Sequence, residues 1–197
     1  HHHRVQPNYA AGALLVYAAF YLNDTEVSNM SQTPKAAVIM GSDSDFPVVK
    51  KCVAMLKKFG ISADVHVISA HRTPDAAAEY AKGAQQAGTD VIIAAAGKAA
   101  HLAGVLAAFT TLPVIGIPMK SSTMDGLDSL LSMVQMPKGI PVATVAIDGA
   151  DNAGILAAQM LALKYPEIAP RLAQFKADMA EEVAKKDEAV AKEAAAL

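Results

Sequence analysis

The sequence predicts one α/β domain built on a five-stranded parallel sheet with helices on both faces, followed by a C-terminal helical arm. The chain has 197 residues, of which 53% are hydrophobic and 18% are charged, which suits a compact domain with a filled core. From Lys35 onward, short apolar runs alternate with longer segments of helical period, the pattern of a parallel sheet covered on both faces. After Pro166 the composition shifts to Ala, Glu and Lys, which indicates a separate charged helix.

Short apolar runs rich in β-branched residues are the predicted strands. They cover residues 36–40, 65–69, 91–96, 114–117 and 142–147. Runs of this kind are typical of strands in a parallel sheet, so we expect each of them to be buried on both faces.

Proline and glycine mark the ends of the first two predicted helices. Pro47 and Pro74 lie where a first helical turn tolerates proline, and Gly60 and Gly88 lie where the same helices should stop. Further helices are expected over 99–110 and 127–134, and another begins near Asp151. The C-terminal helix is expected over 171–196, with one apolar stripe that packs on its own domain or, in the favoured interpretation, on another subunit: Leu172, Phe175, Met179 and Val183.

The first residues stand apart from the rest of the chain. Three histidines at positions 1–3 are typical of an affinity tag, and the apolar run 10–22 is too short to cross a bilayer as a helix. We therefore expect residues 1–29 to be a tag or non-native leader, with Met30 as the natural start. Residues 30–166 then form the α/β domain, and residues 167–197 form the arm, which we interpret as an oligomerisation element.

Charge and cysteine content exclude several classes of protein. The formal net charge is -2, and Lys and Arg are mixed with Asp and Glu, so the sequence lacks the one-signed stripe of a nucleic-acid groove. Cys52 is the only cysteine, which excludes a disulfide framework or a thiolate metal cluster within one chain. We expect a protein of the reducing cytoplasm that binds neither nucleic acid nor membrane.

Ligand sites of open parallel sheets lie at the carboxyl ends of the strands, so the loops there are the candidates. Gly41-Ser42-Asp43-Ser44-Asp45 follows the first strand and opens a helix, with free N–H groups and hydroxyls that suit a phosphate. The Asp45 carboxylate would repel phosphate but can accept hydrogen bonds from two ribose hydroxyls. This pattern indicates a sugar phosphate; the alternative is a cluster of helix-capping residues.

Two more strand ends carry polar residues. In Ser69-Ala70-His71-Arg72-Thr73-Pro74, Arg72 offers a planar fork for phosphate, and the histidine can donate and accept a proton near neutral pH. The alternative is a helix-start histidine beside a solvated arginine. The third loop, 96–104, has small residues that let backbone amides approach a planar ligand, and its His101 either contacts that ligand or caps the helix.

Five motifs taken together resemble the N5-carboxyaminoimidazole ribonucleotide mutase family: GSDSD, SAHRTP, AAHLAG, LDSLLSMVQMPKGIPVATVAI and NAGILAAQML. The resemblance covers Lys35 to Leu163. It implies a flavodoxin-like three-layer sandwich, with 30–166 as the catalytic domain of an octamer whose active sites lie where subunits meet. No cofactor or metal is expected. The implied reaction of de novo purine biosynthesis moves a carboxylate from the exocyclic nitrogen of the aminoimidazole ribonucleotide to ring carbon C4.

The resemblance also assigns roles to residues. His71 is the implied proton shuttle, and the segment 128–137, with Gln135 and Met136, is the implied neighbouring wall. The chain departs from the family at Lys98, where glycine is usual, and at Ala103, where proline is usual; Lys98 either holds the migrating carboxylate or, as we favour, points to solvent or another subunit. The implied substrate-binding residues are Ser42, Ser44, Asp45, Ser69, Ala70, Arg72, Gly97, Lys98, His101 and Leu102.

Two other functions remain open at this point. A sister enzyme carboxylates aminoimidazole ribonucleotide directly with carbon dioxide on the same fold. A more distant alternative is a nucleotide-binding or response-regulator-like module without catalytic activity, for which we would expect clustered acidic residues and Mg²⁺ at the strand ends rather than Ser, His and Arg.

Overall fold

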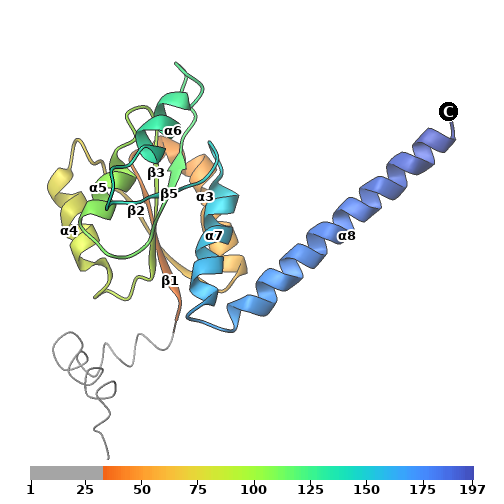
Figure 1. Ribbon diagram of the computed structural model, residues 1–197, viewed down its shortest axis with the longest axis horizontal. Helices are drawn as coiled ribbons and strands as arrows, with labels where there is room; N and C mark the ends of the chain where they lie inside the picture. Colours follow the sequence, from red (N-terminus) through yellow and green to blue (C-terminus); the bar gives the residue numbers. More distant parts are fainter. Residues whose placement is uncertain (1–32) are drawn as a thin grey trace, which may run out of the picture.

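The computed structural model describes residues 33–197, which form a five-stranded sheet in the order β2-β1-β3-β4-β5. All neighbouring strands pair in parallel. Helices cover both faces of the sheet, and one long helix runs away from the domain (Figure 1). The predicted α/β fold with a five-stranded parallel sheet and a C-terminal helical arm is therefore confirmed. The strands are β1 (Lys35–Met40), β2 (Ser62–Val67), β3 (Val91–Ala96), β4 (Val114–Pro118) and β5 (Ala143–Thr144).

The central strands agree with the prediction, and the two edge strands do not. The range predicted for β3 is confirmed, while β1 and β4 are each one residue longer than predicted. Strand β2 was expected over 65–69 but begins at Ser62, because its register pairs Ser62 with Lys35 at the start of β1. Strand β5 was expected over 142–147 but has only two residues, which pair with Ile115 and Gly116.

Burial on both faces is also limited to the central strands. All six residues of β3 are buried, whereas on the edge strand β2 Val65 is 37% and Val67 is 55% exposed. The expectation that every strand is buried on both faces is therefore wrong for β2, and β5 is only half-buried. An edge strand has one neighbour instead of two, so its apolar side chains indicate β structure but not full burial.

The described part of the chain has six helices and one 3-10 turn. The predicted starts at Pro47 and Pro74 are confirmed, since each proline lies in the first turn of its helix. The first helix ends just before Gly60, which has a φ of +76°. The second ends at Ala84, earlier than Gly88 suggested. The elements are η1 (Asp43–Asp45), α3 (Phe46–Lys58), α4 (Pro74–Ala84), α5 (Leu102–Ala108), α6 (Leu127–Val134), α7 (Ala150–Ala162) and α8 (Ile168–Ala195). Helices α3 to α6 connect the strands, and α7 and α8 follow the last strand.

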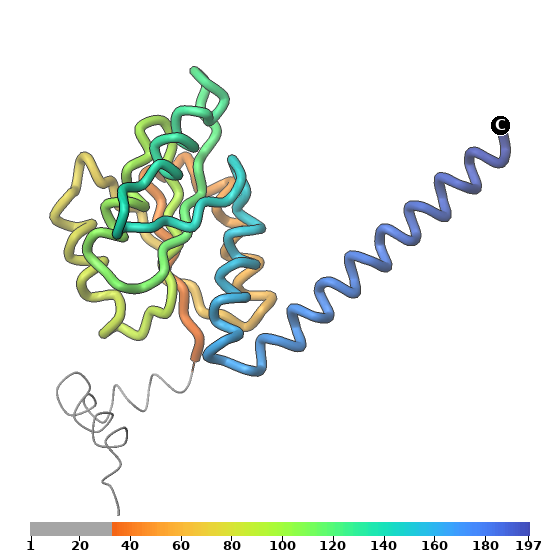
Figure 2. Tube along the Cα trace, in the orientation of Figure 1, coloured from red at the N-terminus to blue at the C-terminus, as the bar shows by residue number. Residues whose placement is uncertain are grey.

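Two hydrophobic layers lie on opposite faces of the sheet. Val38 and Met40 of β1 face one layer, which includes residues of α3 and α7, and Ala37 and Ile39 face the other, which includes residues of α4 and α5. Figures 1 and 2 show these helix pairs on either side of the sheet. Full burial of a side chain such as Ile39 stabilises the fold by about 1.5–3 kcal/mol.

The C-terminal helix α8 is packed at its start and exposed beyond it. Ile168 is buried, and the ring of Phe175 lies edge-on to Phe59 with centroids 5.7 Å apart. Further along, Met179 is 42% and Val183 63% exposed, where the helix leaves the domain (Figure 2). The predicted apolar stripe is thus divided between the protein's own core and an uncovered half.

Some sequence-based expectations concern the start of the chain. The proposed tag or leader at residues 1–29 lies outside the residues that the structure describes.

Among the described helices, none combines the length and the apolar character that crossing a membrane requires.

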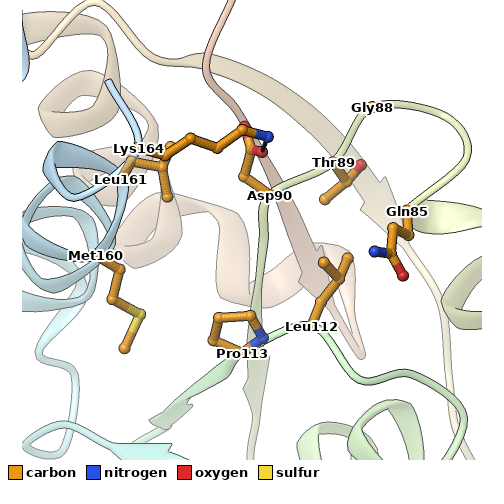
Figure 3. A pocket seen from close by; sticks show the side chains of 9 residues that line it. All are labelled: Gln85, Gly88, Thr89, Asp90, Leu112, Pro113, Met160, Leu161 and Lys164. Carbon is orange, nitrogen blue, oxygen red and sulfur yellow. Dashed lines mark hydrogen bonds and ion pairs between the residues drawn. The ribbon is translucent and has the colours of Figure 1, made fainter. Parts of the chain in front are cut away.

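Asp90 connects several elements at the amino ends of the strands, and Figure 3 shows it beside Lys164. Its carboxylate accepts hydrogen bonds from the Lys164 ammonium at 2.8 Å, the Tyr165 hydroxyl at 2.9 Å and the Lys35 backbone N–H at 3.1 Å. Burial and the bond to Asp90 both raise the pKa of Tyr165. The carboxylate therefore joins the start of β1 and the start of β3 to the segment that follows α7.

We expect Asp90→Asn to lower the free energy of unfolding by about 1–3 kcal/mol, because charged hydrogen bonds are lost at a carboxylate that is only 11% exposed. Urea denaturation measures this change. Glu181→Gln is the control, since its ion pair with Lys185 is exposed on α8 and should contribute less than about 1 kcal/mol. Equal shifts for the two variants would contradict a stabilising role for Asp90.

Candidate active site

A cavity of about 540 Å³ lies at the carboxyl ends of the strands, where the loops after β1, β2, β3 and β4 meet. The loops meet there because parallel strands all end at the same edge of the sheet. Each loop contributes polar groups to the cavity. The predicted proton shuttle and every predicted substrate-binding residue line this cavity: Ser42, Ser44, Asp45, Ser69, Ala70, His71, Arg72, Gly97, Lys98, His101 and Leu102.

The loop after β1 presents hydroxyls and a carboxylate. Ser42 Oγ lies 2.8 Å from Ser44 Oγ and accepts a hydrogen bond from the Ser44 N–H at 3.3 Å, so Ser42 caps the 3-10 turn. The interpretation of this loop as a group of helix-capping residues is thus correct for Ser42. The side chains of Ser42 and Ser44 also line the cavity. Burial raises the pKa of Asp45, as does repulsion from Asp148 to a smaller extent, and a hydrogen bond from the Ser42 backbone opposes them. A ligand hydroxyl that donates to Asp45 would compensate for this unfavourable environment.

A closed set of hydrogen bonds shapes the loop after β2. The Ser69 N–H donates to Thr73 Oγ1 at 3.1 Å, and the Thr73 hydroxyl donates back to the Ser69 carbonyl at 2.8 Å. The Arg72 N–H donates to Ser69 Oγ at 3.1 Å. Ser69 and Thr73 therefore fix the turn that carries His71 and Arg72, and both of these side chains remain exposed at the cavity.

The two histidines of the cavity are hydrogen-bonded to each other. His71 Nε2 lies 2.8 Å from His101 Nδ1, and the rings meet edge-on with centroids 5.0 Å apart and planes at 89°. His101 is the N-cap residue of α5 but makes no side-chain capping bond, so the capping alternative is wrong. Residues thirty positions apart in the sequence thus form one pair.

The loop after β3 contains an unusual backbone conformation. Lys98 has a φ of +54°, in the left-handed region where a Cβ is unfavourable and glycine is favoured. The N–H groups of Ala100 and His101 bond to carbonyls only two residues back, which delays the start of α5 from the predicted residue 99 to Leu102. Ala103 falls in the first turn of α5, a position where proline is also tolerated.

Sequence reasoning missed the loop after β4. Met119, Lys120, Ser121 and Ser122 line the cavity. The Lys120 N–H donates to Asp148 Oδ1 at 2.9 Å, which holds this loop in place. The signal was the cationic and hydroxyl-bearing run Lys120-Ser121-Ser122 directly after an apolar strand.

The wall implied by the resemblance is not part of this cavity. Gln135 and Met136 are absent from its lining, and the Met136 sulfur lies against Gly104 of α5, where an added Cβ would come within 2.9 Å of it. Asp128 accepts a hydrogen bond from the Ser121 hydroxyl at 3.0 Å. Helix α6 therefore supports the fourth loop from behind instead of facing the cavity.

The charged side chains of the lining are three cations, Arg72, Lys98 and Lys120, and one carboxylate, Asp45. This balance suits a ligand with more than one negative charge. Within residues 33–197, we find no group of three or more His, Cys, Asp or Glu side chains that could hold a metal ion.

Fold and site together define a flavodoxin-like α/β protein with a polar cavity suited to a small anionic ligand. The family model "AIR carboxylase" matches residues 35–182, and the chain belongs to this family. The N5-carboxyaminoimidazole ribonucleotide mutase of Thermotoga maritima is 58% identical over 153 residues, which are 78% of this chain and 90% of that protein. The mutase of Pyrococcus horikoshii is 55% identical over 160 residues, 81% of this chain and 90% of the relative.

The fold of the chain is also similar to that of a solved structure. The crystal structure of Treponema denticola PurE aligns with a TM-score of 0.71 at 29% sequence identity, and the alignment covers 79% of this chain and 97% of that one. The family resemblance drawn from the five motifs is therefore confirmed.

We expect Lys98→Gly to be more stable than Lys98→Ala by about 1 kcal/mol, because alanine keeps the Cβ that is unfavourable at a φ of +54° and glycine removes it. Lys98→Ala serves as the matched control, since both variants remove the ammonium. Thermal unfolding of the pair measures the difference. An alanine variant as stable as the glycine variant would show that the left-handed conformation is not strained.

Proposed function

We propose that the protein is an isomerase that converts N5-carboxyaminoimidazole ribonucleotide to 4-carboxyaminoimidazole ribonucleotide in de novo purine biosynthesis. The observation that carries the proposal is the hydrogen-bonded pair of His71 and His101 beside Arg72, in a cavity with an excess of cationic side chains. The reaction needs an anion-binding site and a group that moves protons near neutral pH. Relatives more than half identical to this chain have the name of this activity.

Each part of the substrate has a suitable partner in the cavity. The Arg72 guanidinium provides a planar fork for the phosphate, and Ser42 and Ser44 provide hydroxyl donors. Asp45 accepts from the ribose hydroxyls, since its raised pKa reflects a half-buried carboxylate that gains from added donors. The third loop, with Gly97, His101 and Leu102, borders the base and its carboxylate.

The chemistry transfers a carboxylate without a net change in protons. The bond from the exocyclic nitrogen to the carboxylate breaks, carbon dioxide leaves, and the nitrogen receives a proton. Ring carbon C4 then forms a bond to carbon dioxide, and the proton on C4 is removed. His71 is the proposed proton shuttle, because an imidazole both donates and accepts near neutral pH, and we propose no cofactor or metal.

We further propose a homo-oligomer, an octamer as the family resemblance implies, in which residues 167–197 join subunits and residues 30–166 form the catalytic domain. Support comes from the exposed apolar residues Met179, Val183 and Val190 on the part of α8 that leaves the domain. The cytoplasm is the proposed compartment, because the one cysteine of the sequence, Cys52, is free and buried.

We expect His71→Asn to lower turnover of the carboxyamino ribonucleotide by about 10²- to 10⁴-fold, with little change in KM or Tm, because asparagine keeps a polar group but cannot carry the proton. His66→Asn is the control, since His66 pairs with Asp64 on β2 outside the cavity. A wild-type protein active only on aminoimidazole ribonucleotide with carbon dioxide would instead identify the sister carboxylase.

We expect Met179→Glu with Val183→Glu to dissociate the oligomer, because charges replace the uncovered apolar stripe of α8. The control is Ala177→Glu with Ala184→Glu, which adds the same charge outside the stripe, since the 3.6-residue period places each alanine at least about 100° around the helix from Met179 and Val183. Sedimentation at micromolar concentration distinguishes the two. A wild-type monomer with full activity would contradict the proposed assembly.

A further inference from the structure

Arg72 and Lys120 come from the two outermost of the four loops that line the cavity. Arg72 belongs to the loop after β2, and Lys120 belongs to the loop after β4. The strand order puts β1 and β3 between these two strands, so the ends of β2 and β4 are three strand spacings apart, about 14 Å. The cavity therefore has a cationic residue at each side, which suits a ligand with two separated anionic groups.

The backbone of Lys120 is held in place by contacts within the protein. Its N–H donates to Asp148 Oδ1 at 2.9 Å, and the Asp148 N–H donates to the Pro118 carbonyl at 2.9 Å. Gly126 packs so closely that an added Cβ there would lie 3.2 Å from the Lys120 Cα. Lys120 is thus positioned beside the cavity before any ligand arrives.

The ammonium group of Lys120 is held only weakly. Its ion-pair partner is Asp125 at 4.0 Å, and the two side chains are 63% and 88% exposed, so water screens the attraction between them. Asp125 lies outside the lining of the cavity. Because a lysine head group sits on a flexible four-carbon stem, the ammonium can leave Asp125 for an anion inside the cavity.

The neighbouring Ser121 is not available to a ligand in the same way. Its hydroxyl donates to Asp128 Oδ1 at 3.0 Å and accepts a hydrogen bond from the Met124 N–H at 3.3 Å. The residue is only 8% exposed. Ser121 therefore stabilises the fourth loop, and Lys120 is the charged residue that this loop contributes to the cavity.

We propose that Lys120 binds the carboxylate carried by the base of the ribonucleotide, while Arg72 binds the phosphate at the other side of the cavity. This inference rests on the proposed function. The substrate and the product of that reaction both carry a phosphate and a carboxylate, which the ribose and the imidazole ring keep apart. Aminoimidazole ribonucleotide has the phosphate and lacks the carboxylate. Lys120 is thus a specificity-determining residue that favours carboxylated ribonucleotides over the uncarboxylated one.

The experiment is calorimetric titration of the full chain with 4-carboxyaminoimidazole ribonucleotide and, separately, with aminoimidazole ribonucleotide. We expect Lys120→Gln to raise the Kd of the carboxylated ligand by about 10- to 100-fold and to leave the Kd of the other ligand unchanged, because only the first loses a charged hydrogen bond. Lys120→Arg should retain most of the affinity, since it keeps the cation. The control is Lys57→Gln, an exposed lysine of α3 outside the cavity, which should bind both ligands as wild type does.

The outcomes separate Lys120 from the other cations of the cavity. An equal loss for the two ligands, or no loss for either, would overturn the proposal. So would a selective loss in Lys98→Gln that Lys120→Gln does not show, because Lys98 would then hold the carboxylate. The wild-type protein must also bind the carboxylated ribonucleotide more tightly than the uncarboxylated one, a test that needs no variant to fold.

Binding and turnover fail independently, which keeps this inference distinct from the proposed function. A wild-type protein that shows the selective binding but does not convert the carboxyamino ribonucleotide would overturn the proposed function and leave the assignment of Lys120 intact. A wild-type protein that binds neither ribonucleotide would overturn both.

Discussion

Parallel pairing of the strands is the constraint on which the rest of the structure depends. Strand β1 pairs with β2 and β3, and β4 pairs with β3 and β5, all in the same direction. Every connection must therefore cross a face of the sheet, and every strand ends at the same edge. The loops after four strands line one cavity there. The opposite edge carries the Asp90 cluster, where the contacts are internal and stabilise the fold.

Within the cavity, local hydrogen bonds help to decide where His71 and His101 lie. Ser69 and Thr73 close the second loop on itself, and the left-handed Lys98 delays the helix that follows the third loop. His71 and His101 come from these two loops and meet at 2.8 Å. Ala100 of the third loop is buried in the core, and Ala70 of the second loop packs against the same core cluster, so hydrophobic packing and local hydrogen bonds together hold the pair in place.

The C-terminal helix shows how burial divides one amphipathic element. Its first turns complete the core on the α3 and α7 face, where Ile168 is buried and Phe175 contacts Phe59. Beyond Phe175 the same stripe continues with Met179, which is 42% exposed, and Val183, which is 63% exposed, as the helix leaves the domain. Helices in proteins gain most of their stability from tertiary packing of an apolar face, which is the physical reason for our proposal that the second half makes a subunit contact.

The sequence by itself determined the fold class, the central strands β1, β3 and β4, the proline starts of α3 and α4, and which residues line the cavity on three of its loops. These features depend on short-range pattern: apolar runs, punctuation by Pro and Gly, and polar residues directly after strands. The family motifs carried the function because their order and composition are specific.

Only the tertiary structure decided the features that depend on contacts between distant residues. The limits of the edge strands follow from register with β1 and β4, and the fourth loop belongs to the site because Asp148 holds Lys120 there. Likewise, His101 is a partner of His71 and not a helix cap, and α6 lies behind the cavity. A linear pattern does not encode which of several compatible neighbours a side chain meets, because that choice is made by packing across the whole sheet.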